Sequence, residues 1–173
     1  MMLQYLRYCS VVLLMNEVKR ILDERGISIR AFAKVTGIRP CTLTKYLDAE
    51  EFYYKKGYLH KYWQMANALE VPVEELLIED GWNPTPDIIR KPITIAHAVE
   101  LRAKEWDTSI LDMHNRIRKY IGIPNDYLKY SGYENYRWCP PIPVALKLAK
   151  YLNCTIDALW GEYFKRGINN DAR

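Results

Sequence analysis

The chain has 173 residues, of which 49% are hydrophobic and 27% charged, and its formal net charge is +4 at pH 7. This composition is typical of globular proteins and excludes a largely disordered chain, and the length allows one ordinary domain or two small ones. The charge is compatible with a nucleic-acid partner without requiring one. It is also uneven, since residues 15–80 carry a net charge of −1 and residues 90–173 carry +5.

The first fourteen residues are apolar, but Gln4 and Arg7 interrupt them, and Met15 then opens a stretch that resembles a natural start. This segment is too short to span a bilayer, and it lacks the basic start and small-residue cleavage site of a secretory signal. We therefore expect residues 1–14 to be an N-terminal extension. We expect the protein to be cytoplasmic, with no membrane association.

The cysteines and histidines are widely scattered, with no CxxC pair and no spacing typical of metal ligands. We expect free thiols in a reducing compartment, and neither a metal nor a cofactor. The sequence also contains no paired-carboxylate site and no glycine-rich phosphate loop, so we expect no enzymatic activity and no small-molecule ligand. The cysteines and histidines of the chain are Cys9, Cys41, Cys139, Cys154, His60, His97 and His114.

The chain contains two similar stretches, "TGIRPCTLTKYL … WQMANALEVPVEELL" and "IGIPNDYLKYSG … VALKLAKYLNCTIDALW". Two nearly equal offsets relate them, which favours an internal repeat over chance. We predict two units at 15–80 and 92–165, a Pro-rich linker at 81–91 and a flexible tail at 166–173. The offset of 85 pairs Gly37 with Gly122 and Leu43 with Leu128; the offset of 83 pairs Ala66, Leu69, Val73 and Leu76 with Ala149, Leu152, Ile156 and Leu159.

Helical periodicity runs through both units, and no segment shows the alternation of a strand. In the first unit, a helix ends at Gly26, Ser28 caps a helix from Ile29 to Thr36, and Gly37 supplies a left-handed turn before the helix of "TLTKYL". Two more helices follow at 58–69 and over "PVEELL". In the second unit we expect helices at 93–106, within 110–121, at about 124–130, at 143–152 and at 156–160.

The helix–"TGI"–helix pattern, with Ala33 four residues before Gly37, and the closing "ALEVPVEELL" resemble the Cro/lambda-repressor-like helix-turn-helix family, in its xenobiotic-response-element-like form. The resemblance covers most of 15–80 and, more weakly, 92–165 as a degenerate second copy. It implies an all-α protein of two tandem five-helix helix-turn-helix domains. In this family a small residue at Ala33 lets two helices approach closely, and Ile38 and Leu43 are buried.

By resemblance, the first unit carries the residues that contact DNA. Helices of this kind read base edges in the major groove, and helix N-termini favour phosphate. The alternative for each basic residue is an ordinary solvated face. The resemblance places Ser28 and Arg30 near a phosphate, Arg39, Cys41, Thr44 and Lys45 toward the bases with Thr42 close by, and Lys55 and Lys56 in a loop along the DNA backbone.

The second unit departs from the family pattern. Arg118 replaces Ala33, so either the helices splay, or the register shifts, or Arg118 extends outward. Asp126 takes a groove-facing position, where it repels phosphate, although a carboxylate can accept a hydrogen bond from cytosine. The segment "YENYRWCPPIP" that follows suits a protein interface as well as a nucleic-acid path. We leave both roles open, and the candidate DNA contacts are Lys119, Asn125, Lys129 and Arg137.

The expected function is a sequence-specific DNA-binding transcriptional regulator, a repressor, whose partner is double-stranded DNA. A covalent tandem can mimic the symmetric dimer that reads two half-sites, and a homodimer is compatible with the sequence as well. The alternative is a protein-binding adaptor or inhibitor of mobile-element origin built on the same scaffold.

Overall fold

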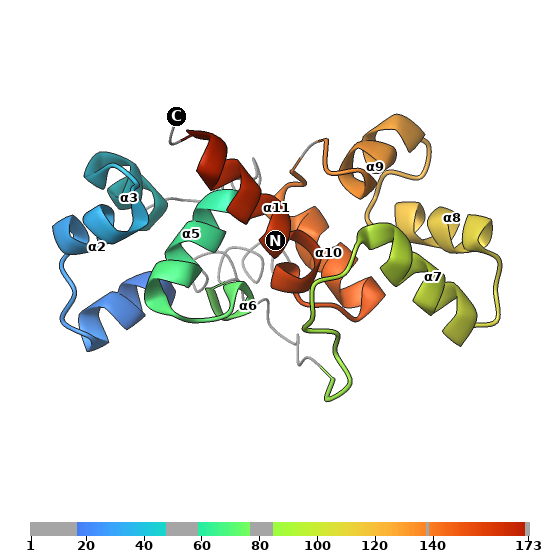
Figure 1. Ribbon diagram of the computed structural model, residues 1–173, viewed down its shortest axis with the longest axis horizontal. Coiled ribbons are helices and arrows are strands. Elements are labelled where there is room, and N and C mark those ends of the chain that lie inside the picture. Colours follow the sequence, from blue (N-terminus) through green and yellow to red (C-terminus); the bar gives the residue numbers. More distant parts are fainter. Residues whose placement is uncertain (1–16, 48–58, 77–84, 138, 172–173) are drawn as a thin grey trace, which may run out of the picture. The chain divides into compact units, whose positions relative to one another are not determined.

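The computed structural model describes residues 17–47, 59–76, 85–137 and 139–171, and in these the chain forms helices joined by turns (Figure 1). The extended pairing in this part of the chain is one isolated bridge between Ile89 and Cys154. The all-α prediction is therefore confirmed. The chain divides into two compact units, Met1–Trp82 and Asn83–Arg173. No helix within the described ranges is long and apolar enough to cross a membrane.

Unit 1 is built around a pair of short helices that pack on a longer one. Residues 17–24 are helical and bury Val18, Ile21 and Leu22. Helix α2 packs against α3 and α5, and α5 packs against α6. The bounds are Ile29–Thr36 for α2, Pro40–Leu47 for α3, Leu59–Leu69 for α5 and Val73–Leu76 for α6.

The corner between α2 and α3 follows from a few local residues. Ser28 caps α2 by accepting a hydrogen bond from the Ala31 N–H at 3.2 Å. Gly37 has φ +68°, a left-handed conformation that residues with a side chain adopt at a cost. The Thr36 hydroxyl accepts a hydrogen bond from the Ile38 N–H, and Ile38 is buried. The predicted cap, turn and helix bounds of α2 are confirmed.

Unit 2 has a larger described core, in which α10 contacts α7, α8 and α11, and α7 packs on α8. The sequence pairs at the offset of 83 are buried in both units, as their pattern predicted. The bounds are Ile95–Glu105 for α7, Ile110–Tyr120 for α8, Tyr127–Glu134 for α9, Ile142–Leu152 for α10 and Ile156–Asp171 for α11.

Helix α11 is much longer than the sequence predicted. We expected it to end near Trp160 and residues 166–173 to form a flexible tail, but the helix continues to Asp171. Trp160 and Phe164 are both buried and lie one turn apart, so the apolar face of the helix continues past the predicted end. The expected tail is thus helical over 166–171.

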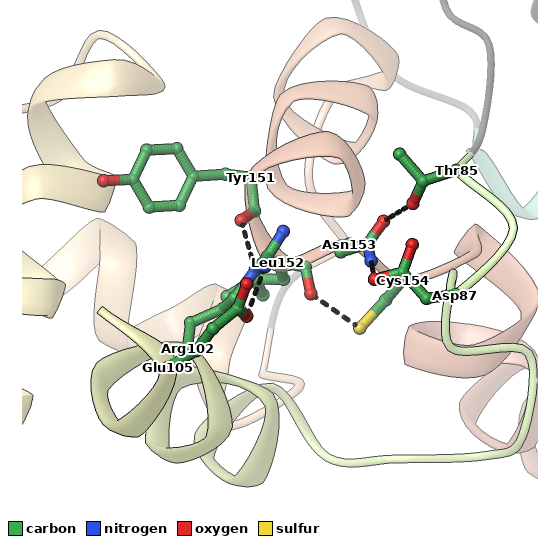
Figure 2. Close-up of polar contacts among 8 residues, drawn as sticks. All are labelled: Thr85, Asp87, Arg102, Glu105, Tyr151, Leu152, Asn153 and Cys154. Carbon is green, nitrogen blue, oxygen red and sulfur yellow. Dashed lines mark hydrogen bonds and ion pairs between the residues drawn. The ribbon is translucent and has the colours of Figure 1, made fainter. Parts of the chain in front are cut away.

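The segment predicted as the second half of a linker is attached to unit 2 (Figure 2). Ile88 is buried, and the Ile89 N–H donates to the Asn153 carbonyl at 2.9 Å. Asn153 ends α10 in a left-handed conformation, and its side chain accepts from the Thr85 hydroxyl at 2.8 Å and donates to Asp87 at 3.2 Å. Residues 85–91 therefore belong to the fold of unit 2 rather than to a linker.

The third prediction to correct is the register of α9. The sequence paired Leu128 with Leu43 as an inward anchor, yet Leu43 is 0% exposed and Leu128 is 78% exposed. Helix α9 begins five residues after Gly122, whereas α3 begins three residues after Gly37. The fourth residue of α9 is therefore Tyr130, which is 0% exposed and takes the place that Leu43 has in α3.

Candidate nucleic-acid interface

The face of α3 that points away from the core is polar and basic. Cys41, Thr44 and Lys45 lie on one side of the helix at spacings of three and four, and all three are exposed. Arg39, also exposed, directly precedes the helix, and Thr42 is half-buried beside it. The structure thus brings together five of the residues that the sequence assigned to DNA contact.

Some backbone groups at the start of α3 are already hydrogen-bonded within the helix. The Arg39 carbonyl accepts from the N–H groups of Thr42 and Leu43, and Pro40 has no N–H to offer a phosphate. The Thr44 hydroxyl donates to the Pro40 carbonyl at 3.1 Å, which leaves its oxygen lone pairs for an outside donor such as a base amino group. Side chains rather than backbone groups therefore carry the recognition chemistry of this face.

The start of α2 adds to this basic surface. The Ser28 oxygen is used in capping, and its hydroxyl proton can still donate outward. Arg30, the second residue of α2, is exposed, and Lys34 is exposed near the end of the helix. Within the described ranges, no ion pair neutralises Arg30, Lys34, Arg39 or Lys45. Lys55 and Lys56 lie outside the described residues.

The predicted contacts of unit 2 are exposed but lie on different elements. Lys119 is in the last turn of α8, Asn125 is in the turn, Lys129 is in α9, and Arg137 follows α9. Asp126 caps α9 by accepting from the Lys129 N–H at 2.9 Å. A carboxylate therefore occupies the place before the helix that Arg39 holds in unit 1, and it repels phosphate.

Arg118 shows how unit 2 accommodates a long side chain at the position of Ala33. It is half-buried, its guanidinium lies 5.4 Å from the centre of the Tyr127 ring, and a hydrogen bond joins it to Asn115. Ala33 is buried beneath the corner of unit 1. Arg118 therefore reaches from α8 to the aromatic face of Tyr127 on α9.

A partly buried polar cluster joins α9 to α8. The Tyr130 hydroxyl lies 2.9 Å from His114 Nδ1, and His114 Nε2 lies 3.7 Å from Glu134. Burial raises the pKa of Tyr130 above its ordinary value, so this phenol stays neutral at physiological pH. The cluster fixes the helix that presents Tyr127 and Leu128 to solvent.

Sequence reasoning missed Tyr127 and Leu128 as surface residues, because it placed the helix at about 124–130. One signal could have located the helix start. Asp126 is a favourable N-cap residue, and the helix begins immediately after it. The tyrosine-rich segment was likewise placed between two helices, whereas Tyr133 and Glu134 belong to α9.

No protein-family model, curated protein or solved structure matched this chain.

Proposed function

We propose that the protein is a sequence-specific DNA-binding transcriptional regulator, a repressor, in which unit 1 is a helix-turn-helix domain of the Cro/lambda-repressor-like type. The observation that carries the proposal is the exposed polar and basic face of α3, made by Cys41, Thr44 and Lys45, together with the exposed Arg39 directly before the helix. The turn that joins α2 to α3 positions this face, with Gly37 in a left-handed conformation and Ile38 buried.

In the proposed complex, α3 enters the major groove, which admits an α-helix and displays a distinct donor and acceptor pattern for each base pair. Arg39 at the start of the helix is suited to bidentate contact with guanine, and Thr44 offers an acceptor. Arg30 and Ser28 at the start of α2 lie against a phosphate. The protein then acts by occluding a promoter, and no chemical step is involved.

Unit 2 is, in this proposal, a diverged copy of the same scaffold. Arg118 stands in the place of Ala33, the small residue that lets the two helices of unit 1 approach closely. Asp126 stands in the place of Arg39, so the basic residue before the helix is lost. Lys119, Asn125, Lys129 and Arg137 remain available for contacts to the DNA backbone. Base reading is therefore assigned to unit 1.

The test is the affinity of the full chain for duplexes from the region upstream of its own gene, measured by fluorescence anisotropy at several salt concentrations. Affinity should fall steeply with salt, because each neutralised phosphate releases counterions. Arg39→Ala should cost about 1–3 kcal/mol and relax the preference at one base pair, and Lys45→Ala should lower the salt slope by about 1. Lys104→Ala, an exposed lysine on α7, is the control. A salt-independent affinity would refute the proposal.

A second candidate function, a protein-binding adaptor or inhibitor, has one observation in its favour. Tyr127 and Leu128 expose apolar side chains at the start of α9. Under this alternative, a stable protein partner would co-purify with the chain, and Arg39→Ala and Lys45→Ala would leave that complex unchanged.

A further inference from the structure

A cavity of about 420 Å³ lies within unit 2, where the start of α7, the end of α9 and helix α11 meet. Its base is apolar, since Ala158 and Leu159 of α11 line it and are both buried. The Ile93 N–H donates to the Ala158 carbonyl at 2.9 Å, which joins the segment before α7 to α11 at this base. A cavity of this volume, with an apolar base and a few polar groups, is typical of sites for small molecules.

Two tyrosine rings line the cavity. Tyr136 follows the end of α9 and Tyr163 lies on α11, and their rings are stacked with centres 5.9 Å apart and planes 26° apart. Tyr136 has φ +57°, a left-handed conformation that glycine adopts at lower cost in the residues after a helix. Tyr163 is 36% exposed. The cavity therefore has an aromatic wall against which a planar ligand can stack.

Two hydroxyl groups of the cavity keep a proton that they can donate. The Tyr136 hydroxyl accepts from the Ile95 N–H at 3.2 Å. The Thr94 hydroxyl accepts from the His97 N–H, also at 3.2 Å. Neither hydroxyl donates to another group within the described ranges. Burial raises the pKa of Tyr136, so this phenol keeps its proton at physiological pH. Both hydroxyls therefore suit a ligand that accepts hydrogen bonds.

Of the two charged residues that line the cavity, Glu162 is already paired and Arg166 is not. Glu162 forms an ion pair with Lys165 at 2.9 Å, and this contact holds the pKa of the Glu162 carboxyl below its ordinary value. Arg166 is exposed one turn further along α11, and no side chain in the described ranges forms an ion pair with it. A guanidinium binds a carboxylate through two parallel hydrogen bonds, so Arg166 favours a ligand with a carboxylate.

We propose that this cavity is a binding site for a small aromatic carboxylate. The ring of the ligand lies on the apolar base against Tyr136 and Tyr163, and its carboxylate accepts hydrogen bonds from Arg166. From the sequence we expected no small-molecule ligand, because the lining residues come from three separate segments that only the fold brings together. Binding at this cavity is independent of the proposed binding of DNA.

The test is a titration of the isotope-labelled full chain with 2-naphthoate, followed by the amide shifts in NMR spectra. The shifts should saturate at millimolar concentrations or below, as expected for a ligand of about thirteen non-hydrogen atoms. They should be largest at residues 92–95, 135–137 and 158–166. The alcohol 2-naphthylmethanol has the same rings and no charge, and it should bind about tenfold more weakly.

Two substitutions separate the charge from the aromatic wall. Arg166→Gln should weaken 2-naphthoate binding about tenfold and leave 2-naphthylmethanol binding unchanged, because only the carboxylate meets the guanidinium. Tyr163→Ala should weaken the binding of both probes about fivefold or more, because it removes part of the wall. Arg116→Gln is the matched control, since it makes the same change at an exposed arginine of α8 outside the cavity. The unbound spectrum of each variant checks that unit 2 remains folded.

The proposal is overturned if 2-naphthoate causes no saturable shifts at these amides, if 2-naphthylmethanol binds as tightly, or if Arg116→Gln weakens binding as much as Arg166→Gln. Tighter binding of the cation 2-naphthylmethylammonium would also overturn it, because Glu162 rather than Arg166 would then select the ligand. A chain that binds 2-naphthoate in the expected way yet binds no duplex would refute the proposed DNA binding and leave this site standing.

Discussion

Replacing Leu128, Tyr130 and Leu43 by alanine, one at a time, tests the register of α9. Leu43 and Tyr130 are both 0% exposed, so each truncation removes buried surface and leaves a cavity. Leu43→Ala should cost about 2–5 kcal/mol of unfolding free energy and Tyr130→Ala about 3–5 kcal/mol. Leu128 is 78% exposed, and Leu128→Ala should change stability by less than about 0.5 kcal/mol.

The assay is urea unfolding of the full chain followed by far-ultraviolet circular dichroism. All variants are measured at the same protein concentration, because any binding of the folded chain adds to its apparent stability. If Leu128→Ala lost about 2 kcal/mol or more while Tyr130→Ala lost less than about 1 kcal/mol, Leu128 would be the inward residue of α9, as the sequence predicted. The register in which Tyr130 is inward would then be refuted. Tyr130→Phe separates packing from the hydrogen bond to His114, and it should cost only about 1 kcal/mol.

Two further predictions concern the end of α10. Asn153→Asp replaces the amide that donates to Asp87 by a second carboxylate, so the amides of residues 85–91 should exchange hydrogen faster in mass spectrometry, and adding Asp87→Asn should reverse this. Unchanged exchange in Asn153→Asp would show that the side chain does not hold the segment. Burial raises the pKa of Cys154 to about 12, so its contribution to stability is complete below about pH 9 and is lost as the pH rises from 9 toward 12. The unfolding free energy of Cys154→Ser should therefore fall less steeply with pH over this range than that of the wild type. Serine keeps the hydrogen bond to the Leu152 carbonyl and does not titrate. Equal slopes in the two proteins would contradict the raised pKa of Cys154.

The sequence by itself determined the local features of unit 1. The cap at Ser28, the left-handed turn at Gly37 and the bounds of α2 depend on backbone groups a few residues apart, so residue types alone specify them. The exposed face of α3 also followed, because helical spacing fixes which residues lie opposite the buried Leu43. The all-α class came from periodicity in the same way.

Only the tertiary structure decided three other features, each of which depends on contacts between residues distant in the chain. The apolar face of α11 continues past Trp160 because Phe164 finds a buried position, and residues 85–91 are held by Asn153, more than sixty residues away. The register of α9 depends on which side chain fills the space beside α8. Leu128 and Tyr130 are both acceptable there by sequence. The longer turn after Gly122 places Tyr130 inside, where its hydroxyl meets His114, and leaves Leu128 exposed.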